Sequence, residues 1–424
     1  MRRYIMLCTY NEMGGGQIYT RNKALYLRSK GWNVSLYTAR SGKLYLNEIN
    51  DFKHDVIPEL ESIPFIIPAE KVNHIIDYIL ENNYDSDTII ESCKDVNAIW
   101  GELIAKKCSG KHVFFCLDEE FPKYHKWFTK FLRFKIKRHE LVGIEKKSIS
   151  MMKPEKSIDE IWKCQDHLDF LCNNYIDKEG KKISLKDTNF DIKFGCISRL
   201  NKSYIIPMVK QLSTFAKNHL DKRICLYIVG GSNKDDALKC KINNVATQAN
   251  NLRIIFLGAM SPIPQKIIDI VDYFIGTAGS ATMTAMAGKI TIAVDTRDAS
   301  PLGIRFYDLR GISTGPYKNE GAFFPYKDLS QYIEHIVFDT NKELLEEDIR
   351  KYAQEMRPKF DFMIAFDKHM DYIEQSVKEK DFFEFHIPYI QKLMYKIKYH
   401  IKYDVNDNNL EKIKYIKNQF FSVI

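Results

Sequence analysis

Residues Leu252 to Asp295 read LRIIFLGAMSPIPQKIIDIVDYFIGTAGSATMTAMAGKITIAVD, and we infer the architecture of the chain from this segment. An apolar run that ends in Gly258 has the length of a buried strand, and two prolines then interrupt any regular element. Strand and helix alternate in the rest: a short helix at Gln265–Val271, a strand at Tyr273–Ile275, a loop at Gly276–Gly279, Ser280 as N-cap, a helix at Ala281–Ala287 and a strand at Ile290–Val294.

This alternation predicts a parallel α/β sheet whose small-residue loop lies at the carboxyl end of a strand, where such sheets bind ligands. Free N–H groups at the start of the helix carry a partial positive charge, and Gly279 lets an anion approach the backbone. The loop therefore suits a phosphate group. The alternative is that Gly276 and Gly279 only make a tight connection.

Length and composition narrow the class of protein. The chain has 424 residues, which predicts about two or three domains, and a hydrophobic share of 45% allows a sizeable core. Apolar runs stay below the roughly 18 to 20 residues of a membrane span, so we expect a cytoplasmic protein. Nine scattered cysteines suggest reduced thiols, and no cluster has the spacing of a metal site. The net charge of +8 is modest for this length, and no nucleic-acid partner is expected.

The amino end predicts another β-α-β unit. Gly14, Gly15 and Gly16 do not fit the pattern G-x-G-x-x-G, and no acidic residue stands where a dinucleotide ribose would need one, so a nicotinamide cofactor is disfavoured. The glycines either admit a bulky substrate or form a plain tight turn. The expected order is a strand at Tyr4–Thr9, a turn at Asn11–Gly16, a helix at Gln17–Ser29 and a strand at Asn33–Thr38.

Carboxylates follow a later strand of this half. We predict strands at Thr88–Ser92 and Val113–Leu117 with a helix at Asn97–Cys108 between them, and the second strand leads directly into Asp118. A carboxylate at the carboxyl edge of a sheet can act as a general base or orient a sugar hydroxyl. The alternative is a solvated acidic loop, because Glu119 and Glu120 follow.

Two basic segments contain many aromatic or apolar residues. Phe121–Arg138 holds seven Lys or Arg and no Asp or Glu, and His386–Tyr403 holds four lysines and no acidic residue. Each segment has an apolar stripe at helical spacing. Such a helix either lies in an anionic membrane surface or packs on the core with its basic side in water.

The polar, aperiodic segment Asp177–Asp191 predicts a domain boundary. Before it we expect a strand at Leu141–Ser150 and a helix at Ile158–Asn173. After it, Arg199 and Lys202 follow a strand, where fixed cations can hold phosphate oxygens. The elements around them are a strand at Phe194–Ile197, a helix at Tyr204–Lys217 and a strand at Ile224–Val229.

Together these segments resemble glycosyltransferases of the GT-B fold, and most closely the family-4-type enzymes of bacterial surface polysaccharide synthesis. GGGQIYTRNKALYLRSKGWNVSLYTA resembles that family's opening glycine loop and helix, and FGCISRLNKSYIIPMVKQL its arginine-lysine strand exit. FLGAMSP resembles the segment that faces the nucleotide base, and GTAGSATMTAMAGKITIAVD the donor-binding loop, helix and strand. The resemblance implies donor-binding roles for Arg199, Lys202, Gly258, Gly279, Ser280, Thr282 and Thr284.

The chain departs from the family in its acidic residues. The family's paired glutamates, seven residues apart, fall on Gly276 and Thr284 here. In the family the first contacts the sugar and the second holds the ribose, so the stereochemical course stays open. The family's histidine of the amino domain is also absent, and Asp118 stands nearest its place as the expected catalytic residue.

The resemblance implies two Rossmann-like domains facing a cleft: an acceptor domain at 1–177 and a nucleotide-sugar domain at 178–358, then a crossover helix at 359–380 and a basic helical tail at 381–424. The implied activity is cofactor-free, metal-independent transfer of a sugar from a nucleoside-diphosphate donor to a glycan or lipid-linked acceptor, with the tail on the anionic inner face of the plasma membrane. The alternatives are a nucleotide-sugar epimerase, or a non-catalytic GT-B protein that binds a sugar nucleotide or a partner transferase.

Overall fold

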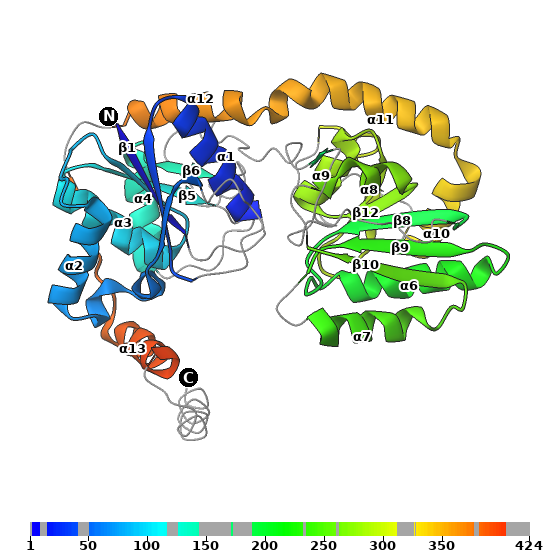
Figure 1. Cartoon of the computed structure of the whole chain (residues 1–424), viewed down its shortest axis with the longest axis horizontal. Coiled ribbons are helices and arrows are strands. Elements are labelled where there is room, and N and C mark those ends of the chain that lie inside the picture. The colour runs from blue at the N-terminus through cyan, green and yellow to red at the C-terminus, as the bar shows by residue number, and fades with distance from the viewer. Residues whose placement is uncertain are drawn as a thin grey trace. The chain divides into compact units, whose positions relative to one another are not determined.

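The computed structural model describes residues 2–8, 15–40, 51–116, 126–143, 171–172, 189–231, 235–259, 263–311, 326, 328–376 and 381–403. The chain divides into two compact units, drawn in Figure 1. The first comprises Met1–Glu12, Lys23–Lys163 and Phe366–Ile424, and the second comprises Met13–Asn22 and Cys164–Ala365.

The first unit is built on a six-stranded sheet in the order β3-β2-β1-β4-β5-β6, in which every neighbouring pair is parallel. Counted along the chain this is the strand order 3-2-1-4-5-6 of a Rossmann domain. The central strand β1 is buried along its whole length, as expected where helices cover both faces of a parallel sheet. The strands are β1 (Arg3–Cys8), β2 (Asn33–Thr38), β3 (Lys53–Val56), β4 (Ile89–Ser92), β5 (Lys111–Cys116) and β6 (Leu141–Gly143).

Helices of the first unit bury apolar residues against this sheet. On α4, Trp127, Phe128 and Phe131 are at most 6% exposed and pack with Phe114 of β5. The core-facing interpretation of this basic, aromatic segment is therefore confirmed for its aromatic side. The helices are α1 (Gly15–Ser29), which belongs to this unit from Lys23 onward, α2 (Ala69–Leu80), α3 (Asp95–Cys108) and α4 (Lys126–Lys137), with short 3-10 turns η2 (Pro58–Glu61) and η3 (Pro64–Ile66).

The second unit repeats the same strand order. Its six-stranded sheet runs β10-β9-β8-β12-β13-β14, parallel except for the pair β13 and β14. A separate two-stranded pair joins β7 (Leu171–Cys172) to β11 (Ile263–Pro264). The sheet strands are β8 (Ile192–Ile197), β9 (Ile224–Val229), β10 (Leu252–Gly258), β12 (Tyr273–Gly276), β13 (Ile290–Val294) and β14 (Pro301–Ile304).

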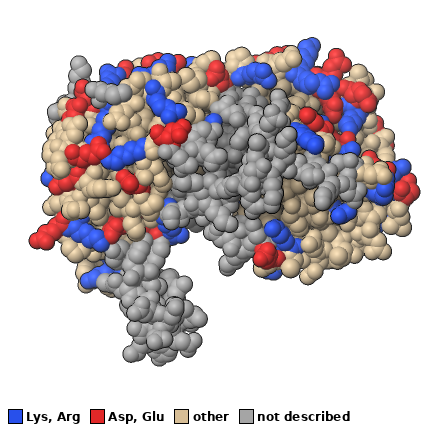
Figure 2. All heavy atoms as spheres, in the orientation of Figure 1, with Lys and Arg blue, Asp and Glu red and all other residues tan. Residues whose placement is uncertain are grey.

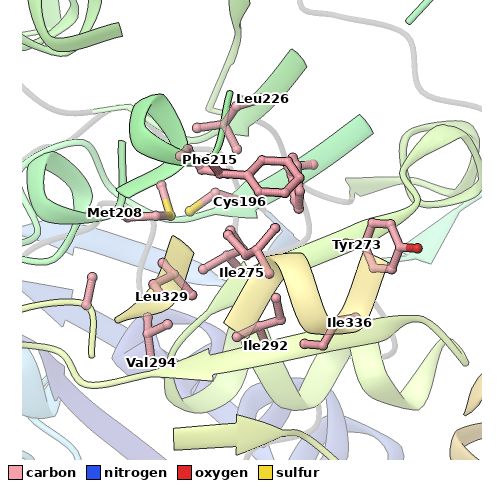
Figure 3. Packing of buried hydrophobic residues seen from close by; sticks show 14 of the residues in the cluster. Cys196, Met208, Phe215, Leu226, Tyr273, Ile275, Ile292, Val294, Leu329 and Ile336 are labelled. Atoms are coloured by element: carbon pink, nitrogen blue, oxygen red, sulfur yellow. The ribbon is translucent and has the colours of Figure 1, made fainter. Parts of the chain in front are cut away.

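Figure 1 shows α6 and α7 on one side of this second sheet and α8 and α9 on the other. The core between the sheet and its helices is apolar, and Phe215 of α6, Ile275 of β12 and Ile336 are among the residues that fill it (Figure 3). The helices are α6 (Ile205–Asn218), α7 (Asp235–Ala246), α8 (Gln265–Ile270), α9 (Ala278–Met286), α10 (Leu329–Glu334), the π-helix η5 (His335–Asp339) and α11 (Lys342–Met356).

The carboxyl-terminal part continues through η6 (Arg357–Phe360), α12 (Phe362–Glu374) and α13 (Tyr389–Tyr403). From Phe366 onward it belongs to the first unit, where the Tyr26 hydroxyl donates to Asp367 at 2.7 Å and Lys30 pairs with the same carboxylate at 2.8 Å. Phe385 then packs edge-on to Trp127, and Ile387 is 6% exposed. The predicted fold class, two Rossmann-like α/β units with a helical carboxyl-terminal part, is confirmed.

Several predicted limits are wrong. The helix expected at Gln17–Ser29 begins at Gly15, and the helix expected at Ala281–Ala287 begins at Ala278 and ends at Met286. Glycine and alanine are small enough to fit both in a tight turn and in the first turn of a helix. The pattern of residues therefore did not show where the turn ends and the helix begins. Leu171–Cys172, expected inside a helix, form β7, and the rest of that predicted helix lies outside the described residues.

Candidate functional site

The parallel strands of the second unit end along one edge of its sheet, so the segments that follow them lie together there. Arg199 follows β8, and Gly230 follows β9. Thr277 follows β12, and Asp295 follows β13. This carboxyl edge of the second sheet is the candidate site, and it contains most of the residues that the sequence assigned to the donor.

Close backbone contacts join the exits of β8, β9 and β10. Gly230 has φ +149°, and a Cβ on it would stand 1.8 Å from the Ser198 carbonyl oxygen. Its N–H donates to the carbonyl of Gly258 at 2.8 Å. Only glycine fits a backbone this close to its neighbour. Gly258, a predicted donor residue, ends β10 at φ +78° with open space where its side chain would lie.

Buried Tyr204 lies beneath the exits of β8 and β12. Its hydroxyl is 3.7 Å from the Cys196 thiol, and burial raises its pKa well above 10, whereas hydrogen bonds with Ser198 and Thr277 partly oppose that rise. Ser203 in turn donates to the carbonyl of Thr296 at 2.6 Å. The segment after β8 therefore touches the segments after both β12 and β13.

Arg199 is an exposed cation at this edge. Among the described residues, no hydrogen-bond acceptor or carboxylate is paired with its guanidinium, so its charge is open to an anionic ligand. Lys202 is also exposed, and its N–H donates to the Arg199 carbonyl at 3.2 Å. The segment thus turns back on itself directly after β8.

Arg297 is a second cation at the same edge, which the sequence interpretation missed. Its Nε and Nη2 donate to the two carboxylate oxygens of Asp295 at 2.9 and 2.6 Å. The Asp295 side chain is 1% exposed, whereas that of Arg297 is 59% exposed. A bidentate pair with a buried carboxylate holds the guanidinium in one orientation. The rule that selected Arg199, a cation shortly after a strand, applies equally to Arg297.

The helix α9 begins between these two cations in strand order. Thr277 takes the N-cap position without a side-chain cap, so Ser280 is not the N-cap; its hydroxyl donates back to the Thr277 carbonyl at 2.9 Å. Gly279 is therefore the second helical residue, in the first turn whose N–H groups lack helical partners. Ala278 has φ +46°, a left-handed conformation that disfavours any residue with a Cβ.

Two predicted donor residues point into the unit. The Thr282 hydroxyl donates to the Ala278 carbonyl at 3.2 Å, and the residue is 4% exposed. Thr284 is 1% exposed, and its hydroxyl lies 2.8 Å from that of Thr291 on β13. These threonines fix α9 against the sheet, so any effect on a ligand acts through the position of the helix.

The predicted acceptor residues are only partly described. Gly14 and Asp118 lie outside the described residues. Gly15 and Gly16 form the first turn of α1 rather than a loop, and the Gly16 carbonyl accepts from Thr20 at 2.9 Å.

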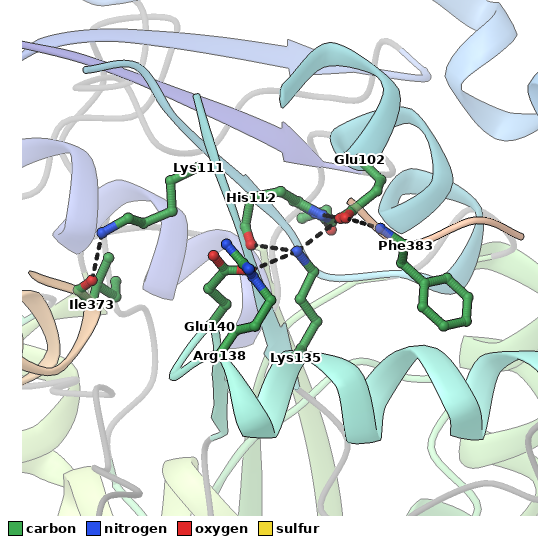
Figure 4. Close-up of polar contacts among 9 residues, drawn as sticks. Glu102, Lys111, His112, Lys135, Arg138, Glu140, Ile373 and Phe383 are labelled. Carbon is green, nitrogen blue, oxygen red and sulfur yellow. Dashed lines mark hydrogen bonds and ion pairs between the residues drawn. The ribbon is translucent and has the colours of Figure 1, made fainter. Parts of the chain in front are cut away.

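A buried polar cluster of the first unit has the geometry of a catalytic triad. Ser92 Oγ lies 2.8 Å from His112 Nε2, and His112 Nδ1 lies 2.6 Å from Glu102 Oε2. All three residues are at most 3% exposed, and Lys135 also pairs with Glu102 at 2.8 Å (Figure 4). Because no substrate can reach a buried hydroxyl, we assign this cluster to stability. Burial opposes ionisation of Glu102, but Lys135 and His112 lower its pKa to about 2.

No group of three or more His, Cys, Asp or Glu side chains within the described ranges is placed to hold a metal ion. No described helix is long and apolar enough to span a bilayer.

Comparison with solved structures identifies the fold. No protein-family model matches the chain, and no curated protein matches it by sequence. HepE of Anabaena, solved with UDP and glucose, superposes with a TM-score of 0.63 at 13% identity, covering 88% of this chain and 100% of HepE. A glycosyltransferase from Rickettsia africae gives a TM-score of 0.61 at 15% identity, covering 88% and 100%.

A protein of Listeria monocytogenes described as a UDP-N-acetylglucosamine 2-epimerase gives a TM-score of 0.50 at 10% identity, covering 90% of this chain and 99% of that one. The chain has the GT-B fold, as the resemblance implied. At these identities the likeness establishes the fold, and the similar structures include one named as a glycosyltransferase and one described as an epimerase.

Proposed function

We propose that the protein is a glycosyltransferase that moves a sugar from a nucleoside-diphosphate donor to a glycan or lipid-linked acceptor in cell-surface polysaccharide synthesis. The observation that carries the proposal is the carboxyl edge of the second sheet, where exposed Arg199 and oriented Arg297 flank the exit that leads into α9. HepE, which has the same fold, was solved with UDP-glucose. The donor therefore binds at this edge.

The proposed chemistry depends on charge at the diphosphate. When the acceptor oxygen bonds to the anomeric carbon, the bond from that carbon to the diphosphate oxygen breaks, and negative charge develops on the leaving diphosphate. The two guanidinium groups and the free N–H groups of Ala278 and Gly279 stabilise that charge without a metal ion. These fixed positive groups stabilise the leaving diphosphate in the way that a bound metal cation would.

The acceptor is assigned to the amino-terminal part of the chain. The region of Gly14, Gly15 and Gly16 binds it, and the Asp118 carboxylate takes the proton of the attacking hydroxyl. Because glycine stands at 276 and threonine at 284 in place of the family's glutamates, the sugar and ribose of the donor are held by other groups.

Membrane contact is proposed for α13 alone. The aromatic side of α4 is buried, but Tyr389, Ile390 and Met394 of α13 are 79%, 67% and 44% exposed. Lys396 is exposed on the same helix. We assign α13 to the anionic inner face of the plasma membrane. An enzyme bound there would reach a lipid-linked acceptor by diffusion along the membrane surface.

Two other functions fit the fold. An epimerase converts a nucleotide sugar without an acceptor, and the Listeria structure favours keeping this candidate. A non-catalytic protein would bind a sugar nucleotide and leave it unchanged, which the missing glutamates favour.

One experiment separates the three. Calorimetry with a panel of nucleotide sugars identifies the donor, and product analysis follows with and without acceptor glycans. We expect binding, and release of nucleoside diphosphate only when an acceptor is present. A changed sugar without an acceptor would establish the epimerase, and binding without any product would establish the non-catalytic protein. Absence of binding to every nucleotide sugar would contradict the transferase and the epimerase, and would leave only a non-catalytic protein that binds a partner transferase.

A further inference from the structure

A buried ammonium joins α1 to α12 in the first unit. Lys23 of α1 is 0% exposed, and its Nζ lies 2.7 Å from His369 Nδ1 on α12. The same Nζ lies 3.4 Å from Glu91 Oε2 at β4 and over the ring of Phe366 at 5.1 Å. The Tyr4 hydroxyl donates to Glu91 at 2.5 Å. Four elements therefore meet at one cation.

The Lys23–His369 contact lies next to both points where the chain passes between the two compact units. The division between the two compact units falls between Asn22 and Lys23 in α1, and between Ala365 and Phe366 in α12. Each of these helices is thus shared by both units, and in both the division lies within one turn of the Lys23 contact. The contact fastens α12 to the first unit immediately after the chain returns to it.

The contact constrains the protonation of His369. An ammonium only donates, so Nδ1 must accept, and the imidazole must be neutral with its proton on the other nitrogen. A second proton would occupy Nδ1 and set two cations against each other. Lys23 and, behind it, Glu91 are charged groups near the ring, and Phe115 of β5 packs on the ring without adding a charge. Burial, followed by Lys23, lowers the pKa of His369 well below 6.5.

We propose that the Lys23–His369 contact is a pH-dependent latch that holds α12 on the first unit and opens when His369 takes up a proton. Other contacts also hold α12 on the first unit, and one involves a second histidine, because the His139 ring stacks on Tyr372 with the ring centroids 5.1 Å apart. Lys111 donates to the Ile373 carbonyl at 2.7 Å, and Arg2 pairs with Glu374 at 2.8 Å. Local opening of α12 is therefore the expected response, and this proposal is independent of the assigned activity.

The sign follows from linkage. A histidine with a lowered pKa in the closed state stabilises that state fully above its ordinary value of about 6.5, and the stabilisation is lost as the pH falls below it. One proton changes the opening equilibrium by at most about tenfold per pH unit. The opening of α12 should therefore rise as the pH falls from 7 to 5.

The test is amide hydrogen exchange of the full-length protein between pH 5 and 8, corrected for intrinsic exchange. Protection of Phe366–Glu374 should fall by up to about tenfold per pH unit below about pH 6.5. His369→Asn, whose carbonyl oxygen replaces Nδ1 as acceptor and does not titrate, should abolish that dependence. His386→Asn, at an exposed histidine, should behave as wild type.

Two results would overturn the latch: protection of α12 that does not change with pH in the wild-type protein, or an unchanged pH dependence in His369→Asn. If His369→Asn does not fold, the imidazole resonance of His369 in the wild-type protein decides. A titration midpoint well below 6.5 supports the latch, and one at or above it contradicts the latch.

Discussion

Ala278 holds a left-handed backbone at the start of α9, with φ +46°. A residue with a Cβ is expected to carry strain of about 1 to 2 kcal/mol there. Glycine removes this strain, but it also increases the conformational entropy of the unfolded chain, which offsets part of the gain in stability. Ala278→Gly should therefore raise the free energy of unfolding by about 0.5 to 1 kcal/mol, measured by urea denaturation.

The matched control is Ala285→Gly, at a fully buried alanine of the same helix, which should lower the free energy of unfolding by about 1 kcal/mol. Equal losses in both variants would show that Ala278 carries no strain.

Arg199 and Arg297 differ in how they are held, and the difference predicts unequal effects. Arg199→Ala should weaken nucleotide-sugar binding by about 1.5 to 3 kcal/mol, the usual value of a charged hydrogen bond. Arg297→Ala should cost less, because that guanidinium is shared with Asp295. Lys210→Ala, on the exposed side of α6, is the control. Calorimetry measures all three, and wild-type affinity in Arg199→Ala would remove its assigned role.

Whether the role of a single residue could be predicted depends on how specific its residue type is for binding a ligand. Arg199 was found because a cation after a strand lies at the ligand edge, and Arg297 could have been found by the same rule. The inward direction of Thr282 and Thr284 could not, because every residue from Ala281 to Met286 is buried and α9 therefore has no polar face. Composition alone does not tell a site hydroxyl from a core hydroxyl.

At the scale of elements, the segment between α12 and α13 is part of the core. Phe383 donates its backbone N–H to Glu102 at 2.7 Å, and Ile387 is 6% exposed (Figure 4). Ile387→Ala should destabilise the first unit by about 2 to 4 kcal/mol, through lost burial and a cavity. Trp32, Trp100 and Trp127 are buried in that unit, so tryptophan fluorescence reports on its unfolding in urea.

Ile390→Ala is the control, because Ile390 is 67% exposed and its removal should change the free energy of unfolding by less than about 0.5 kcal/mol. Similar losses in both variants would mean that the tail is not anchored through Ile387. The sequence interpretation treated residues 381–424 as an addition to the fold. Residues 381–388 form no helix or strand, so their burial left no periodic pattern to detect.

At the scale of the whole molecule, order and spacing of the segments were enough to predict two Rossmann-like domains, because alternating strands and helices have few packing solutions. The surface was harder to predict. Lys and Arg are interspersed with Asp and Glu on the face shown in Figure 2, so the net charge of +8 does not locate a partner. The basic sequence of α4 was misleading as a membrane signal because its aromatic side faces inward.

Membrane binding is therefore expected to depend on α13. The protein should bind vesicles that contain phosphatidylglycerol, and binding should fall with added salt, because each lysine near the surface contributes about 1 kcal/mol. Ile390→Asp combined with Met394→Asp should abolish binding in a co-sedimentation assay, since both side chains are exposed and need not affect folding.

Lys130→Glu on α4 is the control and should leave vesicle binding nearly unchanged. Binding that persists in the double aspartate variant would exclude α13 as the contact. Truncation after Lys380 is unsuitable as a test, because it removes Phe383 and Ile387 from the core.

The assignment of Phe366–Ile424 to the first unit has a consequence for synthesis on the ribosome. The sheet of that unit emerges early, but His369, Phe385 and Ile387, which complete its core, are translated only after the whole of the second unit. The second unit has all its residues once Ala365 has left the exit tunnel. The first unit therefore begins to be synthesised before the second but is completed after it. Part of its core stays exposed while the second unit is translated.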